Sequence, residues 1–272
     1  MRISTGERVG NYVILIIFAA FALGPIITIL STALRPETPQ DAAEGGLLHW
    51  ENFARAWEQG RFGEYMTNSI TVALIVVTSA AVLSIMAGYA LGAFKMRGSQ
   101  VLFYLILLGI MVPAEAIVVP LFFDFQTVGL TNTIWAIALP QIAQSFAFGT
   151  YWMHAYFRGA NRSIIEAARI DGAGHQRVLW QVLIPVARPA VVTMLLLTFM
   201  WTWNEFLIPL VMSPNAQLRT APLGLAMFQG QYTQGTVLLA AGAVLVALPM
   251  VILYLFLQRH FIRGMLEGAV KD

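Results

Sequence analysis

Glu166-Ala167-Ala168-Arg169-Ile170-Asp171-Gly172, continuing to Ile184-Pro185, is a polar and helix-forming segment between two long apolar runs. Ser163 and Glu166 have the spacing of a capping box, in which each side chain accepts a hydrogen bond from the other residue's N–H. We expect a short helix from there to Asp171 and a left-handed stop at Gly172. A membrane protein keeps a polar loop such as 158–187 in water only where another molecule binds it.

A second helix is expected over 175–183, with apolar residues on one stripe. Pro185 is expected to end it, and Pro189 to open the next apolar run. Ala167 and Ala168 give the first helix a smooth face that suits docking in a groove. The alternative is an amphipathic connector that rests on lipid headgroups.

The composition is that of a membrane protein. Apolar residues make up 58% of the chain, charged residues 11%, and the mean hydropathy is +0.71, whereas soluble domains carry about 25% charged residues. Four runs long enough to cross a bilayer lack Asp, Glu, Lys and Arg: 9–34, 65–94, 125–157 and 220–258. Two more contain a single acid each, Glu115 in 98–123 and Glu205 in 189–218. The sequence therefore predicts an all-α polytopic membrane protein with six transmembrane helices, because in lipid only helices satisfy the backbone of stretches this long.

The basic residues predict the orientation of the chain. With Met1 inside and six spans, the inner segments hold 12 of the 16 Lys and Arg residues. The positive-inside rule then places both termini in the cytoplasm, and the sequence pI of about 9.0 needs no nucleic-acid partner. There is no cysteine, so disulfides and thiolate chemistry are excluded. The first apolar run is too long for a signal-peptide core, so we expect it to be retained.

The spans are expected as one domain, 1–272. Their predicted helices are 11–34, 65–94, 101–123, 132–157, 188–212 and 233–258, with the polar loop after the fourth. Gly88 and Gly92 permit a close helix contact, although chance placement explains them equally well. A short surface helix over 49–61, with Trp50 and Trp57, is expected as an interface anchor or a docking site.

The polar loop resembles the coupling loop of permease subunits of bacterial ABC importers. That family carries Glu-Ala-Ala, three residues, Gly, nine residues, an apolar residue, one residue and an apolar-Pro pair. Here Glu166-Ala167-Ala168 is followed at this spacing by Gly172 and then by Val182-Leu183-Ile184-Pro185. The aliphatic positions carry conservative replacements.

The resemblance covers roughly 11–272 and is to the sugar branch of the family, of the MalG-like type. It extends to four further segments: Asn68-Ser69, Trp203-Asn204-Glu205-Phe206 with Pro209-Leu210, Thr220 through Leu225, and Gly264 through Lys271. One departure is Asn161, where the family usually has proline. Ser163 can cap the helix instead, so coupling is expected to survive.

The resemblance implies a set of partners in the bacterial inner membrane. The loop residues Glu166, Ala167, Ala168, Asp171 and Gly172 would sit in a groove of a separate ATPase, where Glu166 would pair with a basic residue. Two ATPase subunits would hold ATP and Mg, the tail 259–272 would lie near them, a second permease subunit would complete the pathway, and an extracytoplasmic solute-binding protein would deliver substrate. This chain would bind no cofactor of its own.

The sequence lacks the lysine-containing motif of a nucleotide-binding site, so ATP-derived energy would have to come from another protein. Only Lys95 and Lys271 exist, and neither follows a glycine-rich phosphate-binding loop. We therefore expect a transport subunit without ATPase activity. Four scattered histidines give no metal-ligand spacing, so no metal is expected.

Polar residues inside the apolar runs are the candidate substrate pathway. Asn204 and Glu205, flanked by Trp201 and Trp203, offer a sugar hydrogen bonds and an apolar face. The alternative is that they bridge helices or lie near the outer boundary. Glu115 could line the same cavity, with a structural or gating role as the alternative. Gln141 and Gln144 are expected to form packing hydrogen bonds.

Three classes of function compete. The leading one is a sugar or oligosaccharide importer permease; glycerol phosphate or another small polar solute is the variant within it. A secondary transporter would use Glu115 and Glu205 as ion carriers, and an intramembrane enzyme lacks any supporting motif. A strongly anionic ligand would need arginine, which the spans lack, although a partner chain could supply it.

Overall fold

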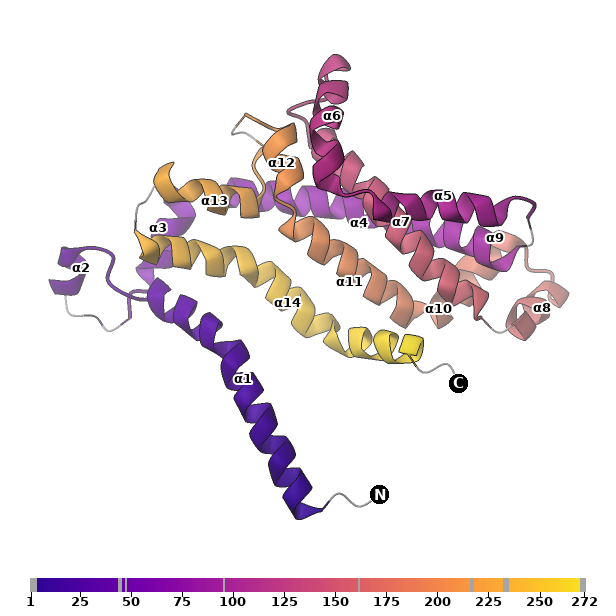
Figure 1. Cartoon of the computed structure of the whole chain (residues 1–272), viewed down its shortest axis with the longest axis horizontal. Helices are drawn as coiled ribbons and strands as arrows, with labels where there is room; N and C mark the ends of the chain where they lie inside the picture. Colours follow the sequence, from indigo (N-terminus) through magenta and orange to yellow (C-terminus); the bar gives the residue numbers. More distant parts are fainter. Residues whose placement is uncertain are drawn as a thin grey trace. The chain divides into compact units, whose positions relative to one another are not determined.

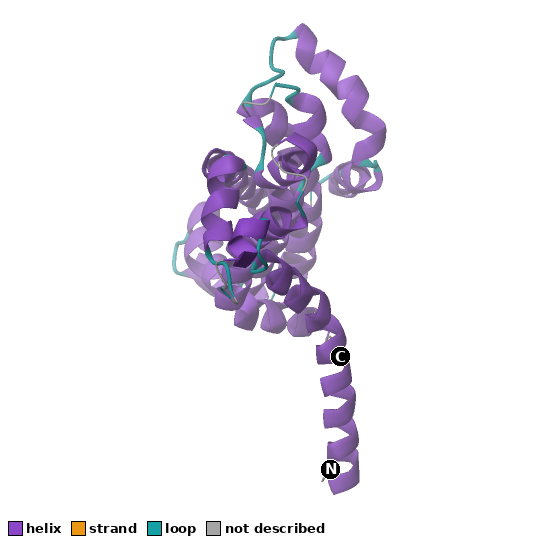
Figure 2. Ribbon diagram, turned by 90° about the vertical axis from the view of Figure 1, so that its left-hand side faces the viewer, coloured by secondary structure: helices purple, strands orange, loops and turns teal. Residues whose placement is uncertain are grey.

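The structure is a computed structural model that describes residues 4–43, 46, 48–94, 96–160, 162–215, 218–231 and 235–269. Within these residues every regular element is a helix, and no strand occurs (Figure 2). The prediction of an all-α protein is therefore confirmed. The chain divides into two compact units, 1–64 with 224–249 and 65–223 with 250–272, which are described separately. The single-domain prediction stays a prediction.

The first unit contains three complete helices, α1 (Thr5–Ala33), α2 (Pro39–Ala43) and α3 (Glu51–Gln59), with parts of α13 (Ala221–Gln231) and α14 (Thr236–Ala269) (Figure 1). A capping box between Ser4 and Glu7 starts α1, six residues before the predicted start. The apolar side chains of α1 are exposed along its length, as expected of a helix that faces lipid.

α3 is fixed to the end of α1 by hydrogen bonds. The buried Asn52 side chain of α3 donates to the carbonyls of Ala33 and Arg35 at 2.9 and 2.8 Å. The Ala33 carbonyl is one of those that a helix end leaves without a partner, and Arg35 follows directly after the C-cap Leu34. Arg55 of the same helix forms two hydrogen bonds to Asp41, which hold the pKa of that carboxyl well below its usual range. The predicted surface helix thus exists as α3 and is tied to α1.

The second unit carries the loop and the candidate pathway. Its long helices are α4 (Phe62–Ala93), which begins in the first unit, α7 (Ile134–Arg158) and α11 (Arg188–Asn204). The shorter elements are α5 (Ser99–Met111), α6 (Ala114–Thr127), α8 (Arg162–Ile170), α9 (His175–Arg177), the π-helix η1 (Val178–Leu183), α10 (Ile184–Val186) and α12 (Leu207–Met212).

Close packing of α4 against α7 depends on glycine. A Cβ at Gly88 would lie 2.6 Å from Met153 Cβ and 2.9 Å from the backbone of α7, and one at Gly92 would lie 3.2 Å from the His154 carbonyl. On the α7 side, a Cβ at Gly149 would meet Ser84 and Met194. Small residues let two backbones approach to this distance. Of the two interpretations of Gly88 and Gly92, close helix contact and chance placement, the structure supports close contact.

The predicted helix over 101–123 is wrong, because the chain breaks there. α5 and α6 meet at an angle of 94°. Pro113 has no N–H to donate to the preceding turn, and proline pushes the residue before it out of the helical region. Val112 is accordingly extended, with φ −79° and ψ 117°. Pro113 precedes the first residue of α6, and Glu115 lies in the first turn of that helix.

The predicted helix over 188–212 is also interrupted. Glu205 is extended, with ψ 125°, and ends α11, and α12 starts two residues later. The Glu205 side chain accepts a hydrogen bond from the N–H of Ile208 at 3.0 Å. The acid thus caps the first turn of α12, which otherwise lacks acceptors for its N–H groups.

The C-terminal part of the chain also differs from the predictions. α14 begins at Thr236 and continues to Ala269, so most of the tail 259–272 is helical. α13 lies between the predicted helices 188–212 and 233–258, where no helix was expected. Among the described residues three helices are long and apolar enough to cross a membrane. Up to five spans result if each of two bent pairs counts as one span, Ser99–Met111 with Ala114–Thr127 and His175–Val186 with Arg188–Asn204. The six-span count stays a prediction.

Replacing Gly88 by alanine is expected to push α4 away from α7, because the added methyl has no room. We expect a loss of about 1–3 kcal/mol in the free energy of unfolding, measured by thermal unfolding of the purified chain in detergent. Gly24→Ala is the control, since nothing lies within 4 Å of its Cβ. Equal stability of the two variants would contradict the packing role.

Replacing Glu205 by alanine removes the cap of α12 and is expected to cost about 0.5–2 kcal/mol of stability. Glu205→Gln retains an oxygen in the position of Oε1 and is expected to stay within a few tenths of a kcal/mol of the wild type. Thermal unfolding measures both. A glutamine variant as unstable as the alanine variant would mean that the charge, rather than the hydrogen bond, stabilises the break.

Candidate functional site

The polar loop 158–187 forms the predicted pair of helices and presents its first helix to solvent. α8 follows α7 at the edge of the second unit (Figure 1). Glu166, Ala167, Asp171 and Gly172 are exposed, as is Ile170 at 86%. α8 therefore offers both polar side chains and an exposed apolar side chain, Ile170, on its free surface.

α8 ends as the sequence predicts. Gly172 has φ +80°, the left-handed conformation that glycine adopts without strain. The N–H of Gly172 donates to the Arg169 carbonyl at 3.0 Å, and that of Ala173 donates to the Ala168 carbonyl at 2.9 Å. This pair of bonds is the Schellman motif, which satisfies the last carbonyls of a helix. The chain after Gly172 is therefore held in one direction by the helix end itself.

The inner face of the loop packs on the core of the second unit. Ile165, Ala168 and Ala173 lie against a buried cluster that includes Val178, Leu179 and Leu183 of η1, Met153 and Phe157 of α7, and Ile85 and Tyr89 of α4. The apolar stripe expected in the second helix is thus confirmed in its core positions. Ala168 is half-buried, so the smooth outer face contains Ala167 without it.

Three details of the loop differ from prediction, and the first is that residues 178–183 form the π-helix η1. α8 begins at Arg162, so Ser163 lies in its first turn and not before it; arginine favours the helix and extends it by one residue. Pro185 does not end the second helix, since it lies in the first turn of α10, where a missing N–H costs little. Asn161 and Lys271 lie outside the described residues.

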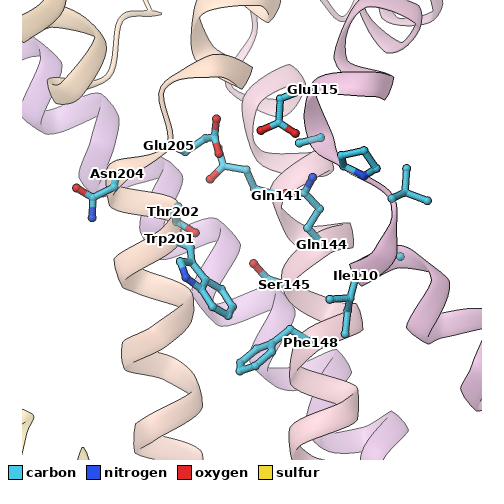
Figure 3. Close-up of a pocket in the computed structure, with 14 residues that line it drawn as sticks. Ile110, Glu115, Gln141, Gln144, Ser145, Phe148, Trp201, Thr202, Asn204 and Glu205 are labelled. Carbon is cyan, nitrogen blue, oxygen red and sulfur yellow. The ribbon is translucent and has the colours of Figure 1, made fainter.

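A pocket of about 440 Å³ lies where the two broken helices face α7 (Figure 3). Residues from α5, α6, α7 and α11, with those at both breaks, line it: Gly109, Ile110, Val112, Pro113, Ala114, Glu115, Gln141, Gln144, Ser145, Phe148, Trp201, Thr202, Asn204 and Glu205. Its wall combines carboxyl, amide and hydroxyl groups with two aromatic rings, the combination found in sites for small polar ligands.

Four of the five predicted pathway residues meet in this pocket: Trp201, Asn204, Glu205 and Glu115. Trp203 does not, since it is 2% exposed and stacks on Phe199 with ring centroids 5.4 Å apart. Residues two apart on a helix point about 200° away from each other, so Trp201 and Trp203 could not share one surface. Trp201 contacts Phe148 edge to face at 4.6 Å.

Sequence reasoning assigned Gln141 and Gln144 to packing, whereas both line the pocket. The signal that could have found them is their spacing with Ser145 and Phe148, at i, i+3, i+4 and i+7 on one face of α7. The Gln141 amide nitrogen donates to the Ile137 carbonyl at 3.0 Å. The Asn204 amide is similarly bound to the Met200 carbonyl at 2.8 Å.

Curated relatives match most of the chain. A permease protein YurM of Bacillus subtilis, described as a probable ABC transporter permease, is 34% identical over 82% of this chain and 74% of its own length. The trehalose transport system permease protein SugB of Mycobacterium tuberculosis is 32% identical over 92% and 93%. The arabinooligosaccharides transport system permease protein AraQ of Halalkalibacterium halodurans is 31% identical over 93% of each chain.

Solved structures agree with the sequence relatives. A bacterial ABC transporter involved in the import of the acidic polysaccharide alginate has a chain that is 26% identical, with a TM-score of 0.75 over 96% of this chain and 99% of that one. Residues 80–267 match the family described as binding-protein-dependent transport system inner membrane component. The chain therefore belongs to the family of inner membrane components of binding-protein-dependent transport systems.

Proposed function

We propose that this chain is a membrane-spanning permease subunit of an ATP-driven, binding-protein-dependent importer for sugars or oligosaccharides. Its relatives include permease proteins for trehalose, arabinooligosaccharides and diacetylchitobiose, which supports a saccharide substrate. A glycerol-3-phosphate permease protein of Yersinia pestis, 28% identical, supports the variant in which the solute is another small polar molecule.

The exposed loop is the observation that carries the proposal. α8 presents Glu166 and Ala167 to solvent, while its inner face is packed on α4 and α7. The loop is the docking element for a separate ATPase subunit, and Glu166 pairs there with a basic residue. Ala168, Asp171 and Gly172 shape the element, because they end α8 and hold it on the bundle.

The complex that follows has several subunits. Two ATPase subunits hold ATP and Mg, a second permease subunit completes the pathway, and an extracytoplasmic binding protein delivers the solute. This chain has no nucleotide-binding loop, so hydrolysis belongs to the partners. Both termini and the loop lie on the cytoplasmic side, in agreement with the distribution of basic residues.

One observation favours a second candidate, an ion-driven secondary transporter. Glu115 and Glu205 line one pocket, as acids that carry ions would. The hydrogen bond between Glu205 and the Ile208 N–H gives that acid a structural role in the same position. Import by this chain alone, driven by a proton gradient in vesicles without ATP, would support the second candidate and contradict the first.

Charge reversal at the loop tests the coupling role. In the complete transporter reconstituted in vesicles, Glu166→Lys is expected to reduce ATP-driven solute uptake roughly tenfold or more, because two like charges then face each other at the ATPase contact. The readouts are solute uptake and ATP hydrolysis.

Glu58→Lys is the matched control. Glu58 is also an exposed acid on a helix, but it lies on α3, which the proposed orientation places on the side opposite to the ATPase subunits. It is expected to leave ATP hydrolysis unchanged. Normal uptake and normal hydrolysis with Glu166→Lys would overturn the coupling role of the loop.

A further inference from the structure

Two buried polar atoms in the pocket wall have no hydrogen-bond partner among the described residues. Gln141 is 4% exposed, and its Oε1 is unpaired although its amide nitrogen is used. Thr202 is 7% exposed, and its hydroxyl is also unpaired. Both residues line the pocket, and Figure 3 shows them on facing helices, Gln141 on α7 and Thr202 on α11. Because buried polar atoms without partners cost free energy, these two favour a ligand that bonds to them.

The pocket wall is rich in hydrogen-bond acceptors and has no basic side chain. Its charged residues are two acids, Glu115 and Glu205. Two helices, α5 and α11, also reach it with their C-terminal ends, which carry partial negative charge. The opposite charge at the N-terminus of α6 is balanced by Glu115 in its first turn. A phosphate or carboxylate group would therefore meet repulsion and acceptors that it cannot satisfy.

Two aromatic rings give the pocket an apolar surface beside these acceptors. Trp201 and Phe148 meet edge to face, with an interplanar angle of 78°. Their rings suit the C–H face of a sugar, while hydroxyl groups on its edge donate to carboxyl and amide oxygens.

We propose that this pocket selects a multiply hydroxylated ligand without an acidic group, whose hydroxyls bond to Gln141 Oε1 and the Thr202 hydroxyl, and that it rejects anionic sugars. The proposal rests on the proposed function in one respect, the place of the pocket on the solute pathway. Thr202 and Gln141 become specificity-determining residues in it.

Direct binding tests the choice of ligand. The full chain in lipid nanodiscs is mixed at equal concentrations with trehalose, an uncharged disaccharide, and with the disaccharide of galacturonic acid. Saturation-transfer NMR detects weak contacts with each. We expect trehalose to bind. The galacturonate disaccharide is expected to bind more weakly, by a factor of roughly five at least, because the two acids repel it. Equal binding of the anion, or no binding of trehalose, would overturn the proposal.

A pair of threonines provides matched variants. Thr150 on α7 is fully buried and has an unpaired hydroxyl among the described residues, as Thr202 does, but it does not line the pocket. Thr202→Val and Thr150→Val remove the same atom and keep the same shape. Thr202→Val is expected to weaken trehalose binding roughly threefold to tenfold, the effect of one lost hydrogen bond, and Thr150→Val to leave it unchanged. Equal effects of the two variants would contradict the role of Thr202.

Gln141→Met gives an independent second variant, because methionine has a similar volume and no strong acceptor. It is expected to weaken trehalose binding to a similar degree. Unchanged binding would remove Gln141 from the proposal. These measurements need neither ATP nor the ATPase subunits, so their failure is distinguishable from a failure of the coupling role, which Glu166→Lys reports.

Discussion

A backbone N–H or C=O group in hydrocarbon has no water to bond, and the structure of this protein depends on that constraint. It explains why the apolar runs are helices. It also explains where helices can stop inside such a chain, because a break exposes backbone groups that need a polar surrounding. The breaks at Val112 and Glu205 both lie at one pocket, and the Glu205 side chain bonds to one of the released N–H groups. The helix breaks and the polar pocket therefore occur together, because backbone groups released at a break need a polar surrounding.

Much of the loop could be predicted from sequence, because its signals are local. Glycine stops, helix-forming residues and apolar stripes are signals that span only one or two helical turns. The stop at Gly172 and the buried face of η1 were therefore predictable from the sequence. The same is true of α3 and α4. The π-helical turn could not, since it depends on how Val178 and Leu183 fit the cluster formed with α4 and α7.

The pocket was only partly predictable. Hydropathy treats Pro113 as one more residue in an apolar run, so it does not reveal the break of 94°. The effect of proline on the conformation of the residue before it predicts a break at Val112. Trp203 was misplaced because proximity in sequence was taken for proximity in space. The glutamines were misassigned for the opposite reason, since a polar residue on α7 has the same sequence signature whether it bonds to a neighbouring helix or faces a pocket.

The Schellman turn at Gly172 has a mechanical consequence. It anchors α8 to its own bundle through Ala168 and Ala173, on a cluster shared with Phe157 and Tyr89. Protein interiors are close-packed and resist compression. If α8 docks on another subunit as proposed, a force on its exposed side would therefore reach α4 and α7 through these packed side chains. Gly172, Ala168 and Ala173 thus fix the direction in which α8 leaves the bundle, which the proposed docking of another subunit requires.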